Sequence, residues 1–432
     1  MKLNKRNIVS WAMFDFANNA FPTLVITFVY AAYFERSITP EGEKSQWAMA
    51  MTIAAVLIAV LSPILGALAD STGKRKQYIF ITTMLCISFT WLLYIPRPGD
   101  VWLALTFVII ANVSMEICNV FYNGLLPDIA PKKHMGKISG IGWGLSYIGG
   151  FLCLLSVLFL FILPTDQPGF FGIVPIELKE PATNFFVGIW FLVFSLPLFV
   201  FLKLPKDATT GLRENERASI ATLAGQTFSK LLKTFKLVST NYKNIFWLLL
   251  ARLFYNDGLV TIFAFGGIYA TAVFDFKTSD LLIFGIVINV ASGIGAICFG
   301  FVEDKIGSRT MIKSSLIGFI FVSLLAVLAP TPQWFWVSAV LVGILSGPNQ
   351  SASRSLMAKF VPDRKENEFF GLFAFSGKAT AFLSPLAWQI LINTTGNERA
   401  AMASVILFFL IGLFLILRVN EYQGIEDSKK TY

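Results

Sequence analysis

Residues 66–75 read GALADSTGKR, and residues 300–309 read GFVEDKIGSR. Both segments follow a long apolar run and share the pattern Gly-x-x-x-Asp-x-x-Gly-x-Arg. The shared positions are Gly66, Asp70, Gly73 and Arg75 in the first copy and Gly300, Asp304, Gly307 and Arg309 in the second. A second repeat relates Pro127-Asp128 and Gly136 to Pro362-Asp363 and Gly371. Its two copies are separated by almost the same number of residues as the two copies of the motif. Two repeats with nearly the same separation indicate that the chain consists of two duplicated halves in parallel orientation.

The repeated motif has the composition of a contact that opens and closes. Its first glycine lets two helices approach closely, and its second permits the tight turn of a very short loop. Asp70 and Arg75 can pair with each other or with the end of a neighbouring helix. We therefore expect both copies to form a gate, with ordinary turn chemistry as the alternative.

The composition is that of a membrane protein. Of 432 residues, 55% are hydrophobic and 14% are charged, whereas a soluble domain has about 25% charged residues. The net charge of +9 lies in short loops between apolar runs rather than on a basic face, so no nucleic-acid partner is expected. With His134 as the sole histidine and four cysteines in apolar runs, we expect no catalytic residues, no metal site and no cofactor.

Apolar stretches of about 20 residues predict an all-α membrane protein with twelve transmembrane helices. The predicted spans are 9–34, 47–69, 78–95, 102–126, 138–163, 185–202, 244–272, 281–303, 311–329, 334–357, 369–394 and 400–418. Lys and Arg cluster at the N-terminus and in every second loop, which predicts that both termini are cytoplasmic. No cleavable signal is visible.

The longest predicted cytoplasmic loop divides the chain into two pseudo-symmetric six-helix bundles. The predicted units are an N-terminal bundle (1–205), a linker (206–243) and a C-terminal bundle (244–432). Apolar residues recur at helical spacing over 220–238, with lysines among them, which predicts an amphipathic helix on the anionic leaflet. A simple tether and a regulatory site are both open as its role.

Five ionisable residues fall inside predicted spans. Placing such a side chain in the membrane costs at least ~2.5 kcal/mol, so each is expected to have a structural or functional role. They are Asp15, Glu116, Arg252, Asp257 and Lys378. Polar neighbours share helical faces with Asp15, Glu116 and Arg252, and a further polar face lies in span 10. These neighbours are Asn18, Asn19 and Pro22; Asn112, Asn119 and Asn123; Tyr255 and Asn256; and Asn349, Gln350, Ser353 and Arg354. Periodicity shows only that such faces avoid lipid.

The whole chain resembles the major facilitator superfamily, whose signature loop between helices 2 and 3 has this motif. Several segments resemble its autophagy-related vacuolar effluxer-like branch. They are 10–21 (SWAMFDFANNAF), 251–258 (ARLFYNDG), 263–269 (FAFGGIY), 353–355 (SRS) and 368–372 (EFFGL). Fungal members of that branch are associated with amino-acid efflux from the vacuole, while bacterial relatives mostly lack an assigned substrate. The compact chain favours a bacterial inner-membrane protein.

The resemblance implies that helices 1, 4, 7 and 10 line a central cavity, and these spans carry most of the polar faces. We therefore expect substrate-binding residues at Asp15, Asn18, Asn19, Glu116, Asn119, Arg252, Tyr255, Asn256, Asp257, Asn349, Gln350 and Lys378. This set contains both positive and negative side chains, which can bind the carboxylate and the amine of an amphoteric solute. Asp15 and Glu116 are the candidates for proton coupling, because Arg252 lies close to Asp257 on one helix.

Two readings of these charges are open: substrate contact, or ion pairs between helices alone. Asp15 and Arg252 could form a gating pair, and Arg354, which ends its span, could be an interfacial anchor. The predicted function is secondary active transport of amino acids or related solutes by alternating access, with the lipid bilayer and a small-molecule substrate as partners. The superfamily implies a monomer. A multidrug exporter, a membrane enzyme and a non-transporting sensor or scaffold are the rival functions.

Overall fold

The computed structural model describes residues 4–40, 46–163, 168–204, 234, 236–380 and 383–430. Within these ranges the chain is helical apart from short connections and one isolated bridge, Gly169 to Val174. Most of the predicted amphipathic helix over 220–238 lies outside the described residues.

The first half comprises α1 (Lys5–Asn18), η1 (Pro22–Phe28), α2 (Tyr30–Tyr33), η2 (Phe34–Ile38), α3 (Trp47–Thr72), α4 (Arg75–Leu92), α5 (Val101–Asn123), α6 (Leu126–Ile129), η3 (Lys132–His134), α7 (Met135–Val157), η4 (Leu158–Ile162), α8 (Gly169–Gly172), η5 (Ile176–Leu178) and α9 (Lys179–Phe201). The second half comprises α11 (Lys243–Phe274), α12 (Thr278–Ile306), α13 (Ser308–Leu328), α14 (Pro332–Phe360), α15 (Glu366–Lys378), α16 (Leu383–Thr395), α17 (Glu398–Ile416) and α18 (Glu421–Asp427).

Nine helical runs among the described residues are long and apolar enough to cross a membrane. The other three predicted spans correspond to α4, to α14 and to the α15–α16 pair. These helices are shorter or more polar. The all-helical fold is thus confirmed, and the number of twelve spans stays a prediction.

Span 11, predicted over 369–394, is interrupted in the structure. The structure has two helices there, with α15 ending at Lys378 and α16 beginning at Leu383. Pro385 provides the physical reason, because it has no backbone N–H for a helical hydrogen bond and is tolerated only in a first turn.

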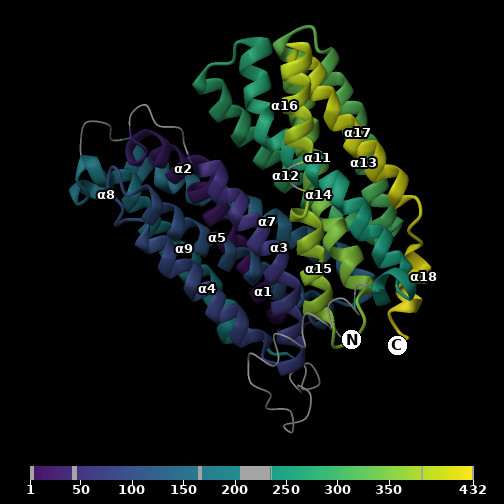
Figure 1. The fold of residues 1–432 in the computed structure, drawn as a ribbon. Helices are drawn as coiled ribbons and strands as arrows, with labels where there is room; N and C mark the ends of the chain where they lie inside the picture. The colour runs from purple at the N-terminus through teal and green to yellow at the C-terminus, as the bar shows by residue number, and fades with distance from the viewer. Residues whose placement is uncertain are drawn as a thin grey trace.

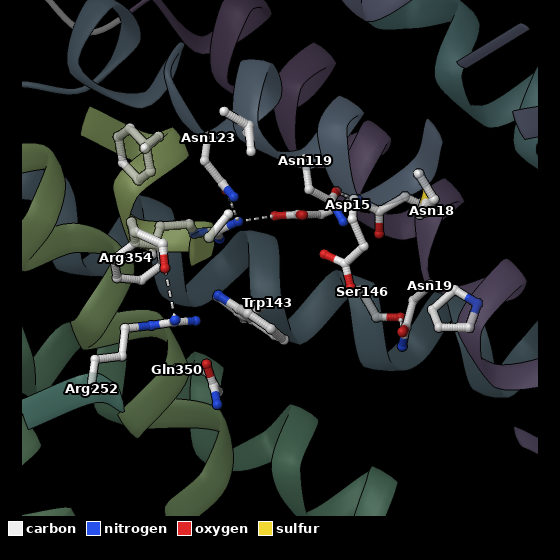
Figure 2. Close-up of a pocket in the computed structure, with 17 residues that line it drawn as sticks. Asp15, Asn18, Asn19, Asn119, Asn123, Trp143, Ser146, Arg252, Gln350 and Arg354 are labelled. Atoms are coloured by element: carbon white, nitrogen blue, oxygen red, sulfur yellow. Dashed lines mark hydrogen bonds and ion pairs between the residues drawn. The ribbon is translucent and has the colours of Figure 1, made fainter. Parts of the chain in front are cut away.

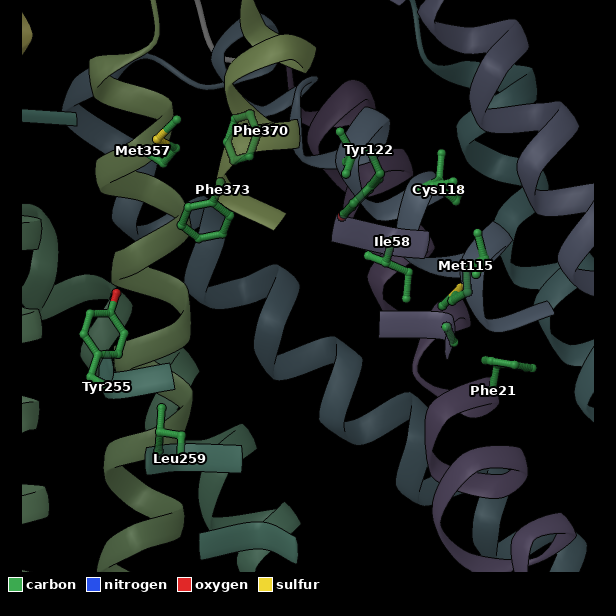
Figure 3. Close-up of a cluster of buried hydrophobic side chains, with 14 of the residues drawn as sticks. Phe21, Ile58, Met115, Cys118, Tyr122, Tyr255, Leu259, Met357, Phe370 and Phe373 are labelled. Carbon is green, nitrogen blue, oxygen red and sulfur yellow. The ribbon is translucent and has the colours of Figure 1, made fainter. Parts of the chain in front are cut away.

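Figure 1 shows the helices of the two halves as two groups that are inclined to each other. They meet along α3 with α15 and along α7 with α12 and α14, and they diverge toward α2, α8 and α16. Both ends of the chain lie at the closed end of the molecule (Figure 1), which we call the terminal end. Figure 3 shows the buried apolar side chains on both sides of this interface, with Phe370 and Phe373 on α15 and Met115 on α5.

Close approach at the interface requires glycine. A Cβ added to Gly66 of α3 would lie 2.2 Å from the backbone oxygen of Asn367, and one added to Gly371 of α15 would lie 2.5 Å from that of Ser62. Neither position therefore accepts a side chain without a shift of backbone. These glycines let α3 and α15 pack directly against each other.

Candidate functional site

A cavity of about 230 Å³ lies between the two halves. It is lined by Asp15, Asn18, Asn19, Pro22, Met115, Glu116, Asn119, Val120, Asn123, Trp143, Ser146, Arg252, Gln350, Arg354, Phe370, Phe373 and Ala374. Figure 2 shows the asparagines and Asp15 on one side, with Arg252, Gln350 and Arg354 on the other. The site therefore combines side chains from both halves.

A buried ion pair joins the halves at this cavity. Arg354 of α14 donates from Nη1 to Oδ2 of Asp15 on α1 at 2.9 Å, and both side chains are buried. Arg354 also donates from Nε to Oγ of Ser139 at 3.0 Å and from Nη2 to its backbone oxygen at 2.8 Å. The prediction that Arg354 only anchors its span is wrong, because its guanidinium is inserted into the N-terminal half.

Aromatic and glycine residues of the N-terminal half shape the socket for this guanidinium. Its carbon lies 4.8 Å from the ring centroid of Trp11 and 5.6 Å from that of Trp143, as a cation–π contact requires. A Cβ on Gly142 would lie 2.2 Å from Oδ2 of Asp15, so α7 needs a glycine there. The socket accounts for the burial of a charged group that would otherwise be costly.

Arg252 of α11 lines the cavity without a carboxylate partner among the described residues. Its Nη1 donates to the backbone oxygen of Phe373 at 2.9 Å, and its guanidinium carbon lies 3.8 Å from the Phe373 ring centroid. Its buried Nε has no hydrogen-bond partner in the described part of the chain. The proposed gating pair of Asp15 with Arg252 is thus wrong, since Asp15 pairs with Arg354.

A second ion pair crosses between the halves. Lys378, the last residue of α15, lies 2.8 Å from Oε1 of Glu116 on α5, and both side chains are about one-third exposed. No acidic residue lies within a helical turn of Lys378 in the sequence. The acid comes instead from the other half of the molecule.

Neutral polar groups complete the wall on the N-terminal side. Asn18 donates from Nδ2 to Oδ1 of Asn119 at 3.1 Å, and Asn19 donates to the backbone oxygen of Ser146 at 3.0 Å. All four residues line the cavity. Their amides orient one another and leave donors and acceptors for a polar solute.

Five predicted cavity residues do not line it: Tyr255, Asn256, Asp257, Asn349 and Lys378. Tyr255 bonds Ser353 at 2.7 Å, and Asn256 donates to the backbone oxygen of Gly377 at 3.0 Å while accepting from Gln350. Asp257 accepts from the backbone N–H of Ser384 at the start of α16, and no ion pair with Arg252 occurs. The side chains of Tyr255, Asn256 and Asp257 thus join helices of the C-terminal half, because helical faces broader than the cavity also meet neighbouring helices.

The first copy of the repeated motif forms a charged cluster at the terminal end. Asp70 accepts hydrogen bonds from the backbone N–H groups of Asn367 and Glu368 at 3.2 and 2.8 Å, so it caps the first turn of α15 from the other half. Arg75 contacts Asp70 at 3.1 Å, Asp128 at 3.0 Å, and Glu366. Arg75 thus links acids from both halves.

The second copy repeats the cap but not the ion pairs. Asp304 accepts from the backbone N–H of Gly136 at 3.0 Å, at the start of α7. Arg309 instead donates to the backbone oxygen of Leu417 at 2.8 Å, within its own half. Gly73 and Gly307 have φ of 64° and 88°, the left-handed backbone that their turns require. Gly300 lies against Gly136 and Gly140 of α7, as Gly66 lies against α15.

The unequal contacts of the two motif arginines give a matched prediction. Arg75→Gln should open the terminal end, because three acids, of which Glu366 is buried, would lose their shared cation; Arg309→Gln should have little effect. Ser62→Cys, on the α3 face against Gly371, is the reporter in a Cys298→Ser background. We expect Arg75→Gln to raise the rate at which the Ser62→Cys reporter is labelled by at least about tenfold.

Equal labelling of both glutamine variants would contradict this assignment of the gate. Substrate uptake measured in the same vesicles distinguishes an effect on closure of the terminal end from an effect on substrate binding. Because the cluster lies outside the cavity lining, the apparent affinity for substrate should stay within a few-fold.

Solved structures with this fold are transporters of the major facilitator superfamily. The chain matches Escherichia coli FucP in its outward conformation with a TM-score of 0.73 and 12% identity, over 96% of this chain and 98% of that one. It matches a bacterial homologue of the iron transporter ferroportin, in an outward-facing state, with a TM-score of 0.71 and 13% identity, over 97% and 99% of the chains. The fold is therefore that of these multi-pass membrane transporters.

Within that class, residues 42–429 match the family described as "Vacuole effluxer Atg22 like", and the chain belongs to this family. The MFS-type transporter YxiO of Bacillus subtilis is 28% identical over 98% of this chain and 96% of its own length. Autophagy-related protein 22-1 of Neosartorya fischeri is 24% identical over 68% of this chain and 49% of its own length. The predicted family is confirmed.

Proposed function

We propose that this transporter moves a small amphoteric organic solute, such as an amino acid, through the cavity between its halves. Arg252 carries the proposal, because it presents a guanidinium to the cavity without a carboxylate partner among the described residues. A charged group in a membrane-embedded site needs compensation. A substrate carboxylate provides it with charge-assisted hydrogen bonds.

The opposite wall suits the ammonium group of the same solute. Asn18, Asn119 and Asn123 offer amide oxygens, and Asp15 and Glu116 offer carboxylates. Arg252 and these acceptors come from different halves, so one amphoteric molecule can link the halves where they already face each other (Figure 2). Binding at both ends of the solute favours molecules that carry both charges.

The cross-half contacts support an alternating-access cycle. The Asp15–Arg354 pair and the Arg75 cluster hold the terminal end closed, and the halves diverge at the other end. We propose that this is the outward-facing state, and that both sets of contacts separate when the halves rock to the inward-facing state. The two halves (1–205 and 244–432) would then move around the linker (206–243).

Proton coupling can act through the same contacts. Asp15 and Glu116 each pair with a cation of the other half, so protonation of either carboxylate would weaken a contact between the halves. The effect of a proton gradient would then be on the rocking motion. We further propose a monomer in a bacterial inner membrane, which the almost full-length match to a Bacillus subtilis relative supports.

Uptake into proteoliposomes tests the function. Purified protein is reconstituted and given a panel of labelled amino acids, together with the matching amines and carboxylic acids, with and without a pH gradient. Accumulation of amino acids above both single-charge analogues is the expected result. Preference for large apolar compounds would favour the rival multidrug exporter, and absence of transport for the whole panel would contradict the proposal.

Orientation gives a further prediction. If both termini are cytoplasmic, a cysteine introduced at position 210 should react only from the cytoplasmic side, and one introduced at Pro175 only from outside. The measurement is labelling of intact cells and of inside-out vesicles with an impermeant maleimide, in the Cys298→Ser background. Labelling of position 210 in intact cells would reverse the proposed topology.

A further inference from the structure

The break between α15 and α16 lies along one face of α11. Thr380 donates from Oγ1 to the backbone oxygen of Leu253 at 3.2 Å. One turn further along both segments, the backbone N–H of Ser384 donates to Oδ2 of Asp257 at 3.1 Å. Residues four apart share a helical face, so positions 253 and 257 both face the break.

Thr261 continues this face of α11 by one more turn. Beyond it, Phe265 contacts Trp388 of α16 with 5.1 Å between the centroids of the two tilted rings. Thr261 therefore lies between two positions that contact α16, and its side chain is fully buried. This places Thr261 on the face of α11 that packs against α16, one turn beyond Asp257.

Three oxygen atoms in this region have no hydrogen-bond partner among the described residues. They are Oδ1 of Asp257, Oγ1 of Thr261 and Oγ of Ser384. The exposed fractions are 2% for Asp257 and 0% for the other two residues. Buried polar atoms in proteins are almost always partnered, so three unpartnered oxygens on adjoining residues call for a ligand.

The charge of the group indicates the kind of ligand. Asp257 forms no ion pair within the described ranges, and Arg252 on the preceding turn is directed to the backbone of α15. A proton would compensate the carboxylate but would leave the hydroxyl oxygens as they are. A metal cation can accept electron pairs from all three oxygens at once.

One carboxylate and two hydroxyls suit a hard cation of single charge. No group of three or more His, Cys, Asp or Glu residues that could hold a metal occurs in the described part of the chain, so a multivalent site is not indicated. The C-terminus of α15 adds the partial negative charge of a helix end at the break. Discontinuous helices at mid-membrane use such ends and oxygens to hold sodium ions.

We propose that Asp257, Thr261 and Ser384 bind a sodium ion at the break between α15 and α16. None of the three lines the cavity, so the ion and the solute occupy separate sites. Asn256 connects the two, because it bonds both Gly377 at the end of α15 and the cavity residue Gln350. The inference extends the proposed transport function by linking it to a sodium gradient, whether or not Asp15 and Glu116 exchange protons.

Direct ion binding tests the site without any substrate. Radioactive sodium is titrated into purified detergent-solubilised protein in choline buffer, and thermal unfolding is followed in parallel. The wild type should bind about one ion per chain and unfold at a higher temperature with sodium than with choline. Asp257→Asn should weaken binding at least about tenfold, and Thr261→Val and Ser384→Ala each several-fold, as expected for lost ligands.

Ser323→Ala is the matched control, because Ser323 is also buried and unpartnered but lies on α13. It should bind sodium as the wild type does, and each variant is checked for folding in choline. Absence of sodium binding by the wild type, or undiminished binding by Asp257→Asn, overturns the proposal. Stabilisation by acid alone that Asp257→Asn abolishes would show a protonated carboxyl and would also overturn it. Sodium binding without amino-acid uptake would support this site while contradicting the proposed substrate.

Discussion

Replacing Arg354 with glutamine is expected to open the terminal end and shift the equilibrium between the two states by about 3–5 kcal/mol, because the variant leaves Asp15 buried without a cation. That free energy corresponds to a change of roughly a hundred- to a few thousand-fold in the ratio of states. Arg354 also holds Ser139 with two hydrogen bonds, so its loss removes several contacts between the halves at once. Labelling of the Ser62→Cys reporter measures the shift.

The double variant Asp15→Asn/Arg354→Gln is the control for this prediction. Two amides of similar shape carry no uncompensated charge, so the double variant should label more slowly than either single variant. If the single and double variants label equally, the ion pair makes no net contribution to closure. The pair would then be reassigned to positioning Arg354 between its tryptophans.

Arg252→Met is expected to lower the affinity for an amino-acid substrate by about ten- to a hundred-fold. A hydrogen bond to a charged group contributes ~1.5–3 kcal/mol, and methionine keeps the length of the side chain without its charge. Arg252→Lys should lose less, because it keeps the charge but not the planar pair of donors. Competition of unlabelled substrate with labelled uptake measures these affinities.

The substrate itself gives the sharper control. The amine that lacks the carboxylate should be recognised equally by the wild type and by Arg252→Met, because its binding does not use the guanidinium. A comparison variant is Arg309→Gln, because Arg309 lies outside the cavity lining and is bonded within its own half. If Arg252→Met weakens the amine and the amino acid alike, Arg252 shapes the cavity through its contact with Phe373 rather than by binding a carboxylate.

Much of the fold could be predicted because it depends on local patterns. Long apolar runs predicted helices, and the repeated motif predicted two halves and their close glycine contacts. The break at Pro385 was visible in principle, since a proline inside an apolar run marks a helix start, but the uniform hydropathy of the region concealed it. The family match over 42–429 confirms the resemblance on which the cavity prediction depended.

The site was predicted less completely, and Arg354 shows why. Its place at the end of a polar run in α14 suggested the membrane interface, and no local pattern indicated the socket formed by Trp11, Trp143 and Gly142. The glycine-rich face of α7 was the available signal, because glycines at that density leave room for a large side chain from another helix. Trp143 lies between Gly142 and Gly144 in the same helix.

The sequence by itself determined which residues are helical, which faces avoid lipid, and which side chains carry charge into the membrane. Only the tertiary structure decided the partners: Asp15 with Arg354, Glu116 with Lys378, Arg75 with acids of both halves, and Asp257 with Ser384 rather than with Arg252. The physical reason is that helical periodicity fixes the direction in which a side chain points from its own axis. Which group the side chain contacts depends on how helices from the other half pack. Asp15 and Arg354, like Glu116 and Lys378, lie far apart along the chain.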